Sequence, residues 1–469
     1  MSAETVKQIS ECFIKPKYEV PEAKKPYYLA PMDLAMLSVH YIQKGLLFNK
    51  PSHLNNNNNQ QPYSTQNLLE TLKDSLSLTL VHFYPLAGRL ATTQVDDHRH
   101  ESLIFVDCNN SPGVRFIHAA VDVTVSDILS PTDVPVVVQS FFDHDRAVNH
   151  DGHSSSLLTI QVTELLDGIF IGCSMNHVLG DGTSYWHFWN MWSEIHGRKG
   201  EELVPLLSRM PLLQRWFPQG YNPPILLPFV QPDEFVTRYE APQLRERIFH
   251  FSPESMARLK AKANEENNNH DITITTKISS FQALSALCWR AIVKANRLPR
   301  DKLTGCRLAT NNRHRLNPPL PQDYFGNCIS AMRTSATVAD LLDHNLGFAA
   351  SLLHQSVLNH SDKIVRDFVT DWLKSPHVYQ LDKLFDCYSV MMGSSPRFDM
   401  YGNEFGLGKA VAVRSGYANK FVGKVTSYEG YEGGGSVDLE ICLPPDSMEV
   451  LESDLEFMGA VSLSCKEVQ

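Results

Sequence analysis

The amino-acid sequence predicts an α/β protein of two domains with mixed sheets. Its 469 residues are too many for one ordinary hydrophobic core, so two domains of about 200 residues each are expected. Strand-like segments alternate with helix-like segments in both halves, and polar residues within the strand-like segments favour mixed over purely parallel sheets. A proline-rich stretch at 201–240 is the expected crossover. The predicted domains are therefore 1–200 and 241–469, joined by 201–240.

The first half contains two predicted helices, followed by strands and a third helix. Residues 34–48 have helical spacing, with Asp33 as the predicted N-cap. Residues 68–80 repeat that spacing, and the aromatic-rich stretch 183–195 predicts a helix whose rings pack in the core. Strands are expected at 103–107, 114–121, 157–163 and 170–175.

The second half repeats this alternation. A strand at 247–251 leads into a helix opened by Ser252 as N-cap and Pro253 at its first position. We then expect a helix at 279–295, a strand at 303–311, helices between 338 and 372, and a final strand at 436–443.

Composition excludes several classes of protein. With 43% hydrophobic and 20% charged residues the chain is an ordinary globular protein, and a net charge of −10 without any basic run argues against nucleic-acid binding. Nine widely spaced cysteines without a Cys-x-x-Cys pair indicate free thiols and neither a disulfide framework nor a zinc site. The chain shows no signal-peptide pattern and no apolar run long enough to span a membrane, so we expect a cytoplasmic protein with no membrane partner.

One motif carries candidate chemistry. His177 follows a strand-like apolar run and precedes a glycine-marked turn, within Ser-Met-Asn-His-Val-Leu-Gly-Asp-Gly that ends at Gly182. An imidazole with a pKa of about 6.5 at such a strand end can take a proton at neutral pH. The spacing His-x-x-x-Asp is weak evidence, since about one match is expected by chance among 19 histidines. The second match, from His118 to Asp122, lacks the following glycine. The motif alone leaves a catalytic base and a buried structural histidine equally open.

Five motifs together resemble the BAHD acyltransferases, the plant enzymes that move an acyl group from coenzyme A (CoA) to an alcohol or amine. In chain order they are Tyr-Pro-Leu-Ala-Gly-Arg at 84–89, His-x-x-x-Asp-Gly at 177–182, Tyr-Phe-Gly-Asn at 324–327, Tyr-Gly-Asn-Glu-Phe-Gly-Leu-Gly at 401–408 and Gly-Gly-Gly-Ser-Val-Asp-Leu-Glu at 433–440. The stretch 33–47 resembles a clade of uncharacterised acetyltransferases, which favours acetyl as the acyl group.

The resemblance implies two chloramphenicol-acetyltransferase-like domains with mixed sheets flanked by helices and an active-site channel between them. It implies that His177 is the general base, and that Asp181 points away from it to pair with an arginine, either Arg313 or Arg315. Acyl-CoA is then the co-substrate, no metal is required, and the acceptor is a small specialised metabolite. We also expect a monomer.

The family's second signature, Asp-Phe-Gly-Trp-Gly, departs here at two positions. Glu404 stands in place of the aspartate and Leu407 in place of the tryptophan. Gly406 and Gly408 are intact and preserve the tight backbone. Leucine for tryptophan removes contact area on the order of 100 Å². Either the acceptor pocket is wider or more aliphatic, or position 407 only packs.

Candidate CoA contacts come from the same resemblance. Ser279 and Ser280 open a predicted helix, where an N-terminus suits an anionic ligand, although Ser279 also serves as a simple N-cap. Lys409 could meet a CoA phosphate, with a solvated lysine as the alternative. Ser394 and Ser395 are weaker candidates.

Other enzyme classes fit less well. The chain has neither the Gly-x-Ser-x-Gly motif of serine hydrolases nor the His-Glu-x-x-His motif of metalloproteases. Gly406 and Gly408 are not followed by the third glycine that the dinucleotide-binding motif Gly-x-Gly-x-x-Gly requires. Two alternatives remain open. One is a lyase of the same fold that uses His177 without CoA, and the other is a catalytically silent binding protein.

Overall fold

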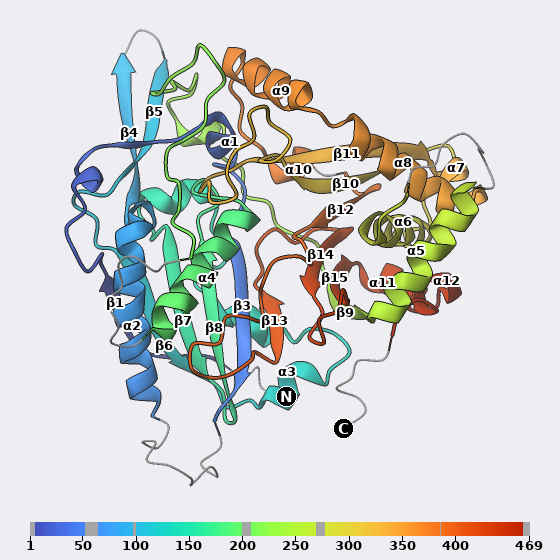
Figure 1. The fold of residues 1–469 in the computed structure, drawn as a ribbon, viewed down its shortest axis with the longest axis horizontal. Helices are drawn as coiled ribbons and strands as arrows, with labels where there is room; N and C mark the ends of the chain where they lie inside the picture. Colours follow the sequence, from blue (N-terminus) through green and yellow to red (C-terminus); the bar gives the residue numbers. More distant parts are fainter. Residues whose placement is uncertain are drawn as a thin grey trace.

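The computed structural model describes residues 5–51, 64–96, 100–198, 208–268, 277–384 and 386–462. It has two halves, each built on a sheet with helices packed against it (Figure 1). The helices are α1 (Pro31–Leu34), α2 (Thr65–His82), α3 (Val125–Leu129), α4 (Gly182–Gly197), α5 (Pro253–Asn268), α6 (Ser280–Ala295), α7 (Val338–Asp343), α8 (Leu346–Asn359), α9 (Asp362–Lys374), α10 (Leu381–Leu384), α11 (Pro445–Glu452) and α12 (Leu455–Met458). The strands are β1 (Lys7–Ile14), β2 (Tyr27–Tyr28), β3 (Ile42–Asn49), β4 (Arg89–Asp96), β5 (Glu101–Asp107), β6 (Val114–Ala120), β7 (Leu158–Glu164), β8 (Gly168–Met175), β9 (Arg245–Phe251), β10 (Leu303–Asn311), β11 (Ile329–Thr337), β12 (Ser389–Gly393), β13 (Ala412–Ser415), β14 (Lys424–Glu429) and β15 (Val437–Leu443).

The first sheet, within the described ranges, has the strand order β1-β6-β7-β8-β3-β13. The pair β6–β7 is parallel and the other pairs are antiparallel, so the sheet is mixed as predicted. Strand β8 is buried along its whole length because it lies in the middle of the sheet and is covered on both faces. Helices α2 and α4 pack against this sheet, and their apolar side chains join its core.

The second sheet has the order β11-β10-β12-β14-β15-β9 among the described residues. Its central pairs β10–β12 and β12–β14 are parallel and its outer pairs antiparallel, which again confirms a mixed sheet. Helix α6 is the most deeply buried of its covering helices, with α5 and α8 packed against it. A small sheet of β2, β5 and β4 extends from the first half.

The predicted helix at 34–48 is wrong. Only Pro31–Leu34 is helical, and Ile42–Asn49 is strand β3, paired on one side with β8 and on the other with β13. The strand is buried on both faces, so its apolar residues do not alternate with polar ones and their spacing resembles that of a helix. Asp33 lies inside the short helix, where its Oδ2 accepts a hydrogen bond from the backbone N–H of Ala30.

The two sheets do not divide the chain at a single point. Strand β13 comes from the C-terminal half of the chain and completes the first sheet. The preceding stretch joins the same core through Tyr401 and Phe405. Of the predicted crossover, residues 201–207 lie outside the described ranges. The rest touches the first half, where the Tyr27 hydroxyl donates to the Leu213 carbonyl at 2.8 Å.

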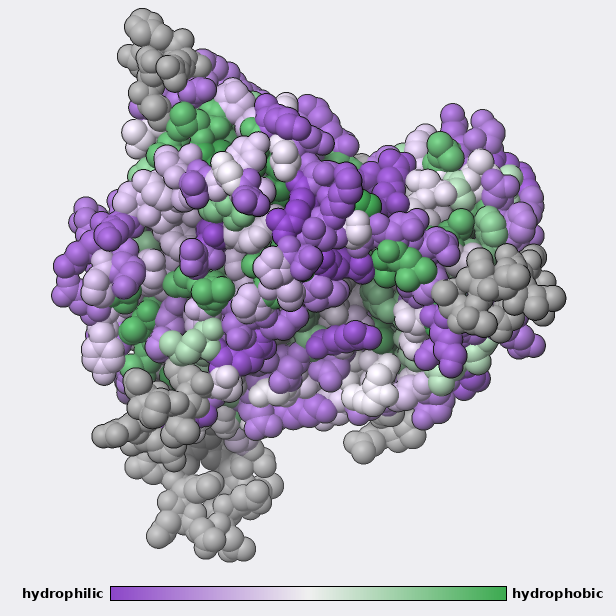
Figure 2. Space-filling model, turned by 45° about the horizontal axis from the view of Figure 1, so that its top comes forward, coloured by the Kyte–Doolittle hydropathy of each residue, from purple (hydrophilic) through white to green (hydrophobic). Residues whose placement is uncertain are grey.

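The face of the molecule seen in Figure 2 is mostly hydrophilic, and the apolar residues on it form small separate groups. None of the helices in the described part of the chain is long and apolar enough to cross a membrane.

Candidate active site

A cavity of about 1350 Å³ lies between the two halves. His177, Lys44 and Trp186 line it from the first half, and Met391 and Lys424 line it from the second. Small-molecule pockets usually measure about 300–1000 Å³. This cavity therefore has room for two reactants at once.

His177 lies just beyond the end of β8, and its side chain lines the cavity. Its backbone N–H donates to Oδ1 of Asn149 at 2.7 Å. The Asn149 amide nitrogen in turn donates to the Met36 carbonyl at 2.8 Å. The loop around Asn149 thus holds the histidine backbone at the strand end.

The imidazole of His177 is oriented by Asn327, whose Oδ1 lies 3.1 Å from Nδ1. The Asn327 amide nitrogen donates to the His177 carbonyl at 2.7 Å and to Oδ1 of Asp33 at 2.9 Å, so its oxygen must face the imidazole. An amide oxygen only accepts hydrogen bonds, so Nδ1 carries the proton and Nε2 has the free lone pair. Within the described ranges, no residue is hydrogen-bonded to Nε2.

The Asp33 carboxylate holds Asn327 in place through hydrogen bonds. Its Oδ1 also accepts the Asn327 backbone N–H at 3.0 Å, and its Oδ2 lies 2.9 Å from Nε of Arg215 in a fully buried ion pair. The Arg215 guanidinium also donates to the carbonyls of Phe325 and Leu179. From the sequence, Asp33 is predicted only as a helix cap, and neither Asn327 nor Arg215 is predicted to have a role at the site. Their partners are distant in sequence, so no local pattern signals this chain of contacts.

Burial lowers the pKa of His177 below its ordinary value, and the positive charge of Lys424 lowers it further. The charge of Asp181 and the hydrogen bond that the imidazole donates to Asn327 act in the opposite direction. The net lowering keeps the imidazole neutral at neutral pH, which a general base requires.

Asp181 forms an ion pair with Arg313. Of the two arginines that the sequence offers as its partner, Arg313 and Arg315, the structure selects the first. The two guanidinium nitrogens of Arg313 donate to the carboxylate at 2.8 and 3.0 Å, and both side chains are fully buried. Arg315, named as a site residue, is therefore not the partner. Its guanidinium donates to the carbonyls of Val357 and His360.

The Asp181 carboxylate is also bound by the backbone. It accepts the N–H of Cys328 at 2.9 Å and caps α4 through the N–H of Ser184 at 3.1 Å. Burial opposes its ionisation, but Arg313 outweighs that effect and the pKa of Asp181 is lowered. The ion pair joins the start of α4 to the loop after β10, which fixes the two halves next to His177.

Gly182 and the serines at 394 and 395 lie on the cavity wall. A Cβ at Gly182 would come within 3.3 Å of the Phe398 ring, so the close approach of the two halves here favours glycine. Ser394 follows β12 and has a positive φ of 65°.

The segment 404–408 lies away from the cavity, at the packing surface of α4. Phe405 contacts the rings of Trp189 and Trp192, at centroid distances of 5.7 and 4.6 Å. Gly406 and Gly408 have φ of 73° and 81°, which favours glycine. Leu407 is half-buried against the first core and is not among the cavity-lining residues, and Glu404 is exposed.

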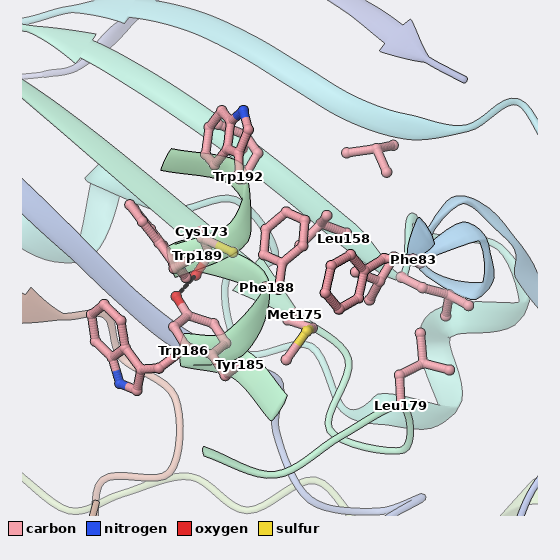
Figure 3. Close-up of a cluster of buried hydrophobic side chains, with 14 of the residues drawn as sticks. Phe83, Leu158, Cys173, Met175, Leu179, Tyr185, Trp186, Phe188, Trp189 and Trp192 are labelled. Atoms are coloured by element: carbon pink, nitrogen blue, oxygen red, sulfur yellow. Dashed lines mark hydrogen bonds between the residues drawn. The ribbon is translucent and has the colours of Figure 1, made fainter. Parts of the chain in front are cut away.

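The aromatic face of α4 is core, as predicted. Figure 3 shows Tyr185, Phe188 and Trp189 against Cys173 and Met175 of β8. The Tyr185 hydroxyl donates to the Cys173 carbonyl at 3.0 Å. His118, as predicted, is a strand residue, and its Nε2 lies 2.7 Å from Glu164.

Three of the candidate CoA contacts do not line the cavity. Ser279 caps α6 through the N–H of Gln282, and Ser280 is the first residue of that helix. Lys409 is exposed, donates to the Tyr431 carbonyl at 2.6 Å and lies over the Tyr431 ring.

A cluster of charged side chains on the cavity wall has no signal in the sequence. It consists of Lys44, Lys420, Lys424 and Glu440. These residues come from different strands and the loop before β14, so only the fold brings them together. Within the described ranges, no group of three or more His, Cys, Asp or Glu side chains is arranged to hold a metal ion.

Comparison with known proteins agrees with this architecture. The profile of the Transferase family matches residues 4–458. An uncharacterized acetyltransferase of Arabidopsis thaliana is 36% identical over 96% of this chain and 98% of its own length. The BAHD acyltransferase DCR of the same plant is 34% identical over 97% and 92% of the two chains.

Among solved structures, TRI101 of F. graminearum complexed with ethyl coenzyme A superimposes with a TM-score of 0.71, covering 93% of this chain and 98% of that one at 16% identity. The predicted fold of two acyltransferase-like domains is thus confirmed. The family match over nearly the whole chain and the acyltransferase relatives lead to one conclusion: the chain belongs to the Transferase family of BAHD acyltransferases and is an acyl-transferring enzyme.

Proposed function

We propose that this enzyme moves an acyl group from an acyl-CoA to a hydroxyl or amine of a small metabolite, with His177 as the general base. One observation carries the proposal. The His177 imidazole lines a cavity large enough for two reactants, and Asn327 holds it in the tautomer that leaves Nε2 free.

The chemistry follows from that geometry. Nε2 of His177 takes the proton of the acceptor hydroxyl or amine, whose oxygen or nitrogen attacks the thioester carbonyl carbon. The tetrahedral intermediate collapses, the carbon–sulfur bond breaks, and the CoA thiolate leaves and takes the proton back from the imidazolium. Asp181 takes no part in the proton transfer, since Arg313 and backbone N–H groups occupy its oxygens.

Acyl-CoA as donor is supported by family membership and by the TRI101 structure, which is complexed with ethyl coenzyme A. Acetyl is the acyl group we favour, because one relative is named as an acetyltransferase. Ser394 and Ser395, on the cavity wall, are the proposed donors of hydrogen bonds to the CoA arm.

We further propose that the enzyme acts as a monomer in the cytoplasm. Both halves of a single chain line the cavity, so a second chain is not needed to complete it. Light scattering of the purified protein measures the oligomeric state directly.

The proposal is tested by release of free thiol from acetyl-, malonyl-, benzoyl- and hydroxycinnamoyl-CoA in the presence of pooled plant metabolites, with products read by mass spectrometry. His177→Ala should lower turnover by about 10²- to 10⁴-fold while CoA affinity stays unchanged. His118→Ala is the matched control, because His118 is a strand residue bonded to Glu164. Unchanged turnover in His177→Ala would contradict the role of the base. Conversion of an acceptor without thiol release would instead indicate a lyase.

A further inference from the structure

The charged cluster on the cavity wall, Lys44, Lys420, Lys424 and Glu440, also contacts Glu246 behind it. Lys420 contacts both Glu246 and Glu440, the latter at 3.5 Å. Lys44 donates to the Tyr428 hydroxyl at 3.2 Å, and that hydroxyl donates to Glu440 at 3.0 Å. Lys420 is thus paired with both glutamates, and the Lys44 ammonium is linked to Glu440 through the Tyr428 hydroxyl.

Lys424 differs from the other two lysines because its ammonium has no hydrogen-bond partner among the described residues. In that part of the chain no carboxylate lies within 4.0 Å of it, and it lies 5.8 Å from the centroid of the Phe421 ring. Burial outweighs the attraction of the nearby acidic groups and lowers the pKa of Lys424 to about 8. An ammonium without a counter-ion on a cavity wall is ready to receive one from a ligand.

The fold makes room for this ammonium. Lys424 and Thr426 alternate along β14 and face the cavity, opposite Cys442 and Glu440 of β15. On the other side, strand β12 ends at Gly393, and a Cβ there would collide with Nζ of Lys424. The lysine head thus occupies a space that a side chain at 393 would fill.

The Lys424 ammonium and the His177 imidazole line the same cavity. The positive charge of Lys424 also contributes to the lowered pKa of His177. The charges of CoA are on its nucleotide, at the opposite end of the pantetheine arm from the sulfur. An anion that meets a cation near the base therefore belongs to the acceptor and not to CoA.

We propose that the ammonium of Lys424, in the space left by Gly393, binds a carboxylate on the acceptor substrate. This inference rests on the proposed function and deepens it, because it limits the acceptors to small hydroxy or amino compounds that carry a carboxylate. The Lys424 ammonium pairs with the carboxylate and Nε2 of His177 takes the proton of the nucleophile. One group thus fixes the orientation of the acceptor and the other carries the chemistry.

The test measures binding first, so that it does not depend on turnover. Calorimetric affinities are compared for two matched pairs of probes, benzyl alcohol with its ring-carboxylated analogue and cyclohexanol with its carboxylated analogue. The wild type should bind the carboxylated member of at least one pair more tightly. Lys424→Met should weaken that binding by about 10- to 100-fold and leave the neutral member unchanged. Lys424→Arg should retain the preference, and exposed Lys302→Met is the charge-matched control.

Gly393→Ala provides a second variant in case Lys424→Met does not fold, because it displaces the ammonium without removing the lysine. It should weaken carboxylate binding in the same way. His177→Ala separates this inference from the proposed function: it should keep the carboxylate preference while transfer is lost. An enzyme that shows the preference but transfers no acyl group would contradict the proposed function alone.

Three results would overturn the inference. The first is equal affinity of the wild type for the members of both pairs. The second is a parallel loss of CoA affinity in Lys424→Met, which would assign the cation to a CoA phosphate. The third is a selective loss of malonyl-CoA use relative to acetyl-CoA with a neutral acceptor, which would assign it to the acyl chain.

Discussion

The Asn327 side chain accepts a hydrogen bond from the His177 imidazole at 3.1 Å, across the boundary between the two halves of the molecule. Asn327 is itself held by Asp33, 294 residues away in sequence, and Asp33 is held by Arg215. The tautomer of the proposed base therefore depends on contacts between three separate parts of the chain.

Replacing Asn327 tests this chain of contacts. Asn327→Ala should lower kcat by about 10- to 100-fold with little change in KM, because the imidazole loses the acceptor that selects its tautomer. Asn264→Ala, which removes a comparable side-chain bond to the backbone at Ile278, is the structural control. If both variants lose the same activity in proportion to folded protein, Asn327 has only a structural role.

The pH profile of kcat/KM should report the environment of His177. Burial lowers its pKa, so the midpoint of the acidic limb should lie below 6.5, and activity should fall as pH decreases through it. Lys424→Met removes a charge that lowers this pKa, so the midpoint should move to higher pH. An unchanged midpoint would show that the two side chains do not interact.

The Asp181–Arg313 pair should matter most for folding. Asp181→Asn leaves the Arg313 charge buried without its partner and should lower the free energy of unfolding by about 3–5 kcal/mol, measured by urea denaturation. The pKa of Asp181 is lowered in the folded protein, so its contribution is complete above the unfolded value and is lost as pH falls. A variant of unchanged stability but without activity would make Asp181 a participant in the chemistry.

Lys424→Met should stabilise the protein although it removes a proposed binding group. The pKa of Lys424 falls from 10.5 to about 8 on folding, which costs roughly 3 kcal/mol at neutral pH. That cost is complete below pH 8 and disappears as pH rises toward 10.5, because the unfolded chain then also loses the proton. The denaturation midpoint should rise at pH 7, and the gain over wild type should shrink at alkaline pH.

Leu407→Trp should change stability without changing acceptor preference. Leu407 packs against the first core and does not line the cavity, so a larger side chain should overpack its surroundings by about 1–3 kcal/mol. Relative rates with small and bulky acceptors should stay constant. A selective loss of bulky acceptors would place the side chain at the acceptor pocket after all.

The elements around His177 could be predicted from the sequence because their signals are local. The apolar run of β8 and the aromatic spacing of α4 each lie within one segment. Strand β3 was mistaken for a helix because both of its faces are buried, so neither alternation nor a polar side marks it. The contacts of Asn327 and Asp33 that orient His177, and the cluster around Lys424, bring together residues that are far apart in sequence. The candidate base was thus predictable, whereas the groups that orient it and that face the acceptor were not.

The short strand β13 has a consequence for how the chain reaches its native state. During synthesis on the ribosome, β3 has an open edge until Ala412–Ser415 emerges and pairs with it. An apolar strand with an unpaired edge is a template for aggregation. Expression of the N-terminal half alone should therefore yield insoluble protein, while co-expression with the C-terminal half should rescue it. Such a result would show that the two halves, which share the walls of one cavity, fold as a single unit.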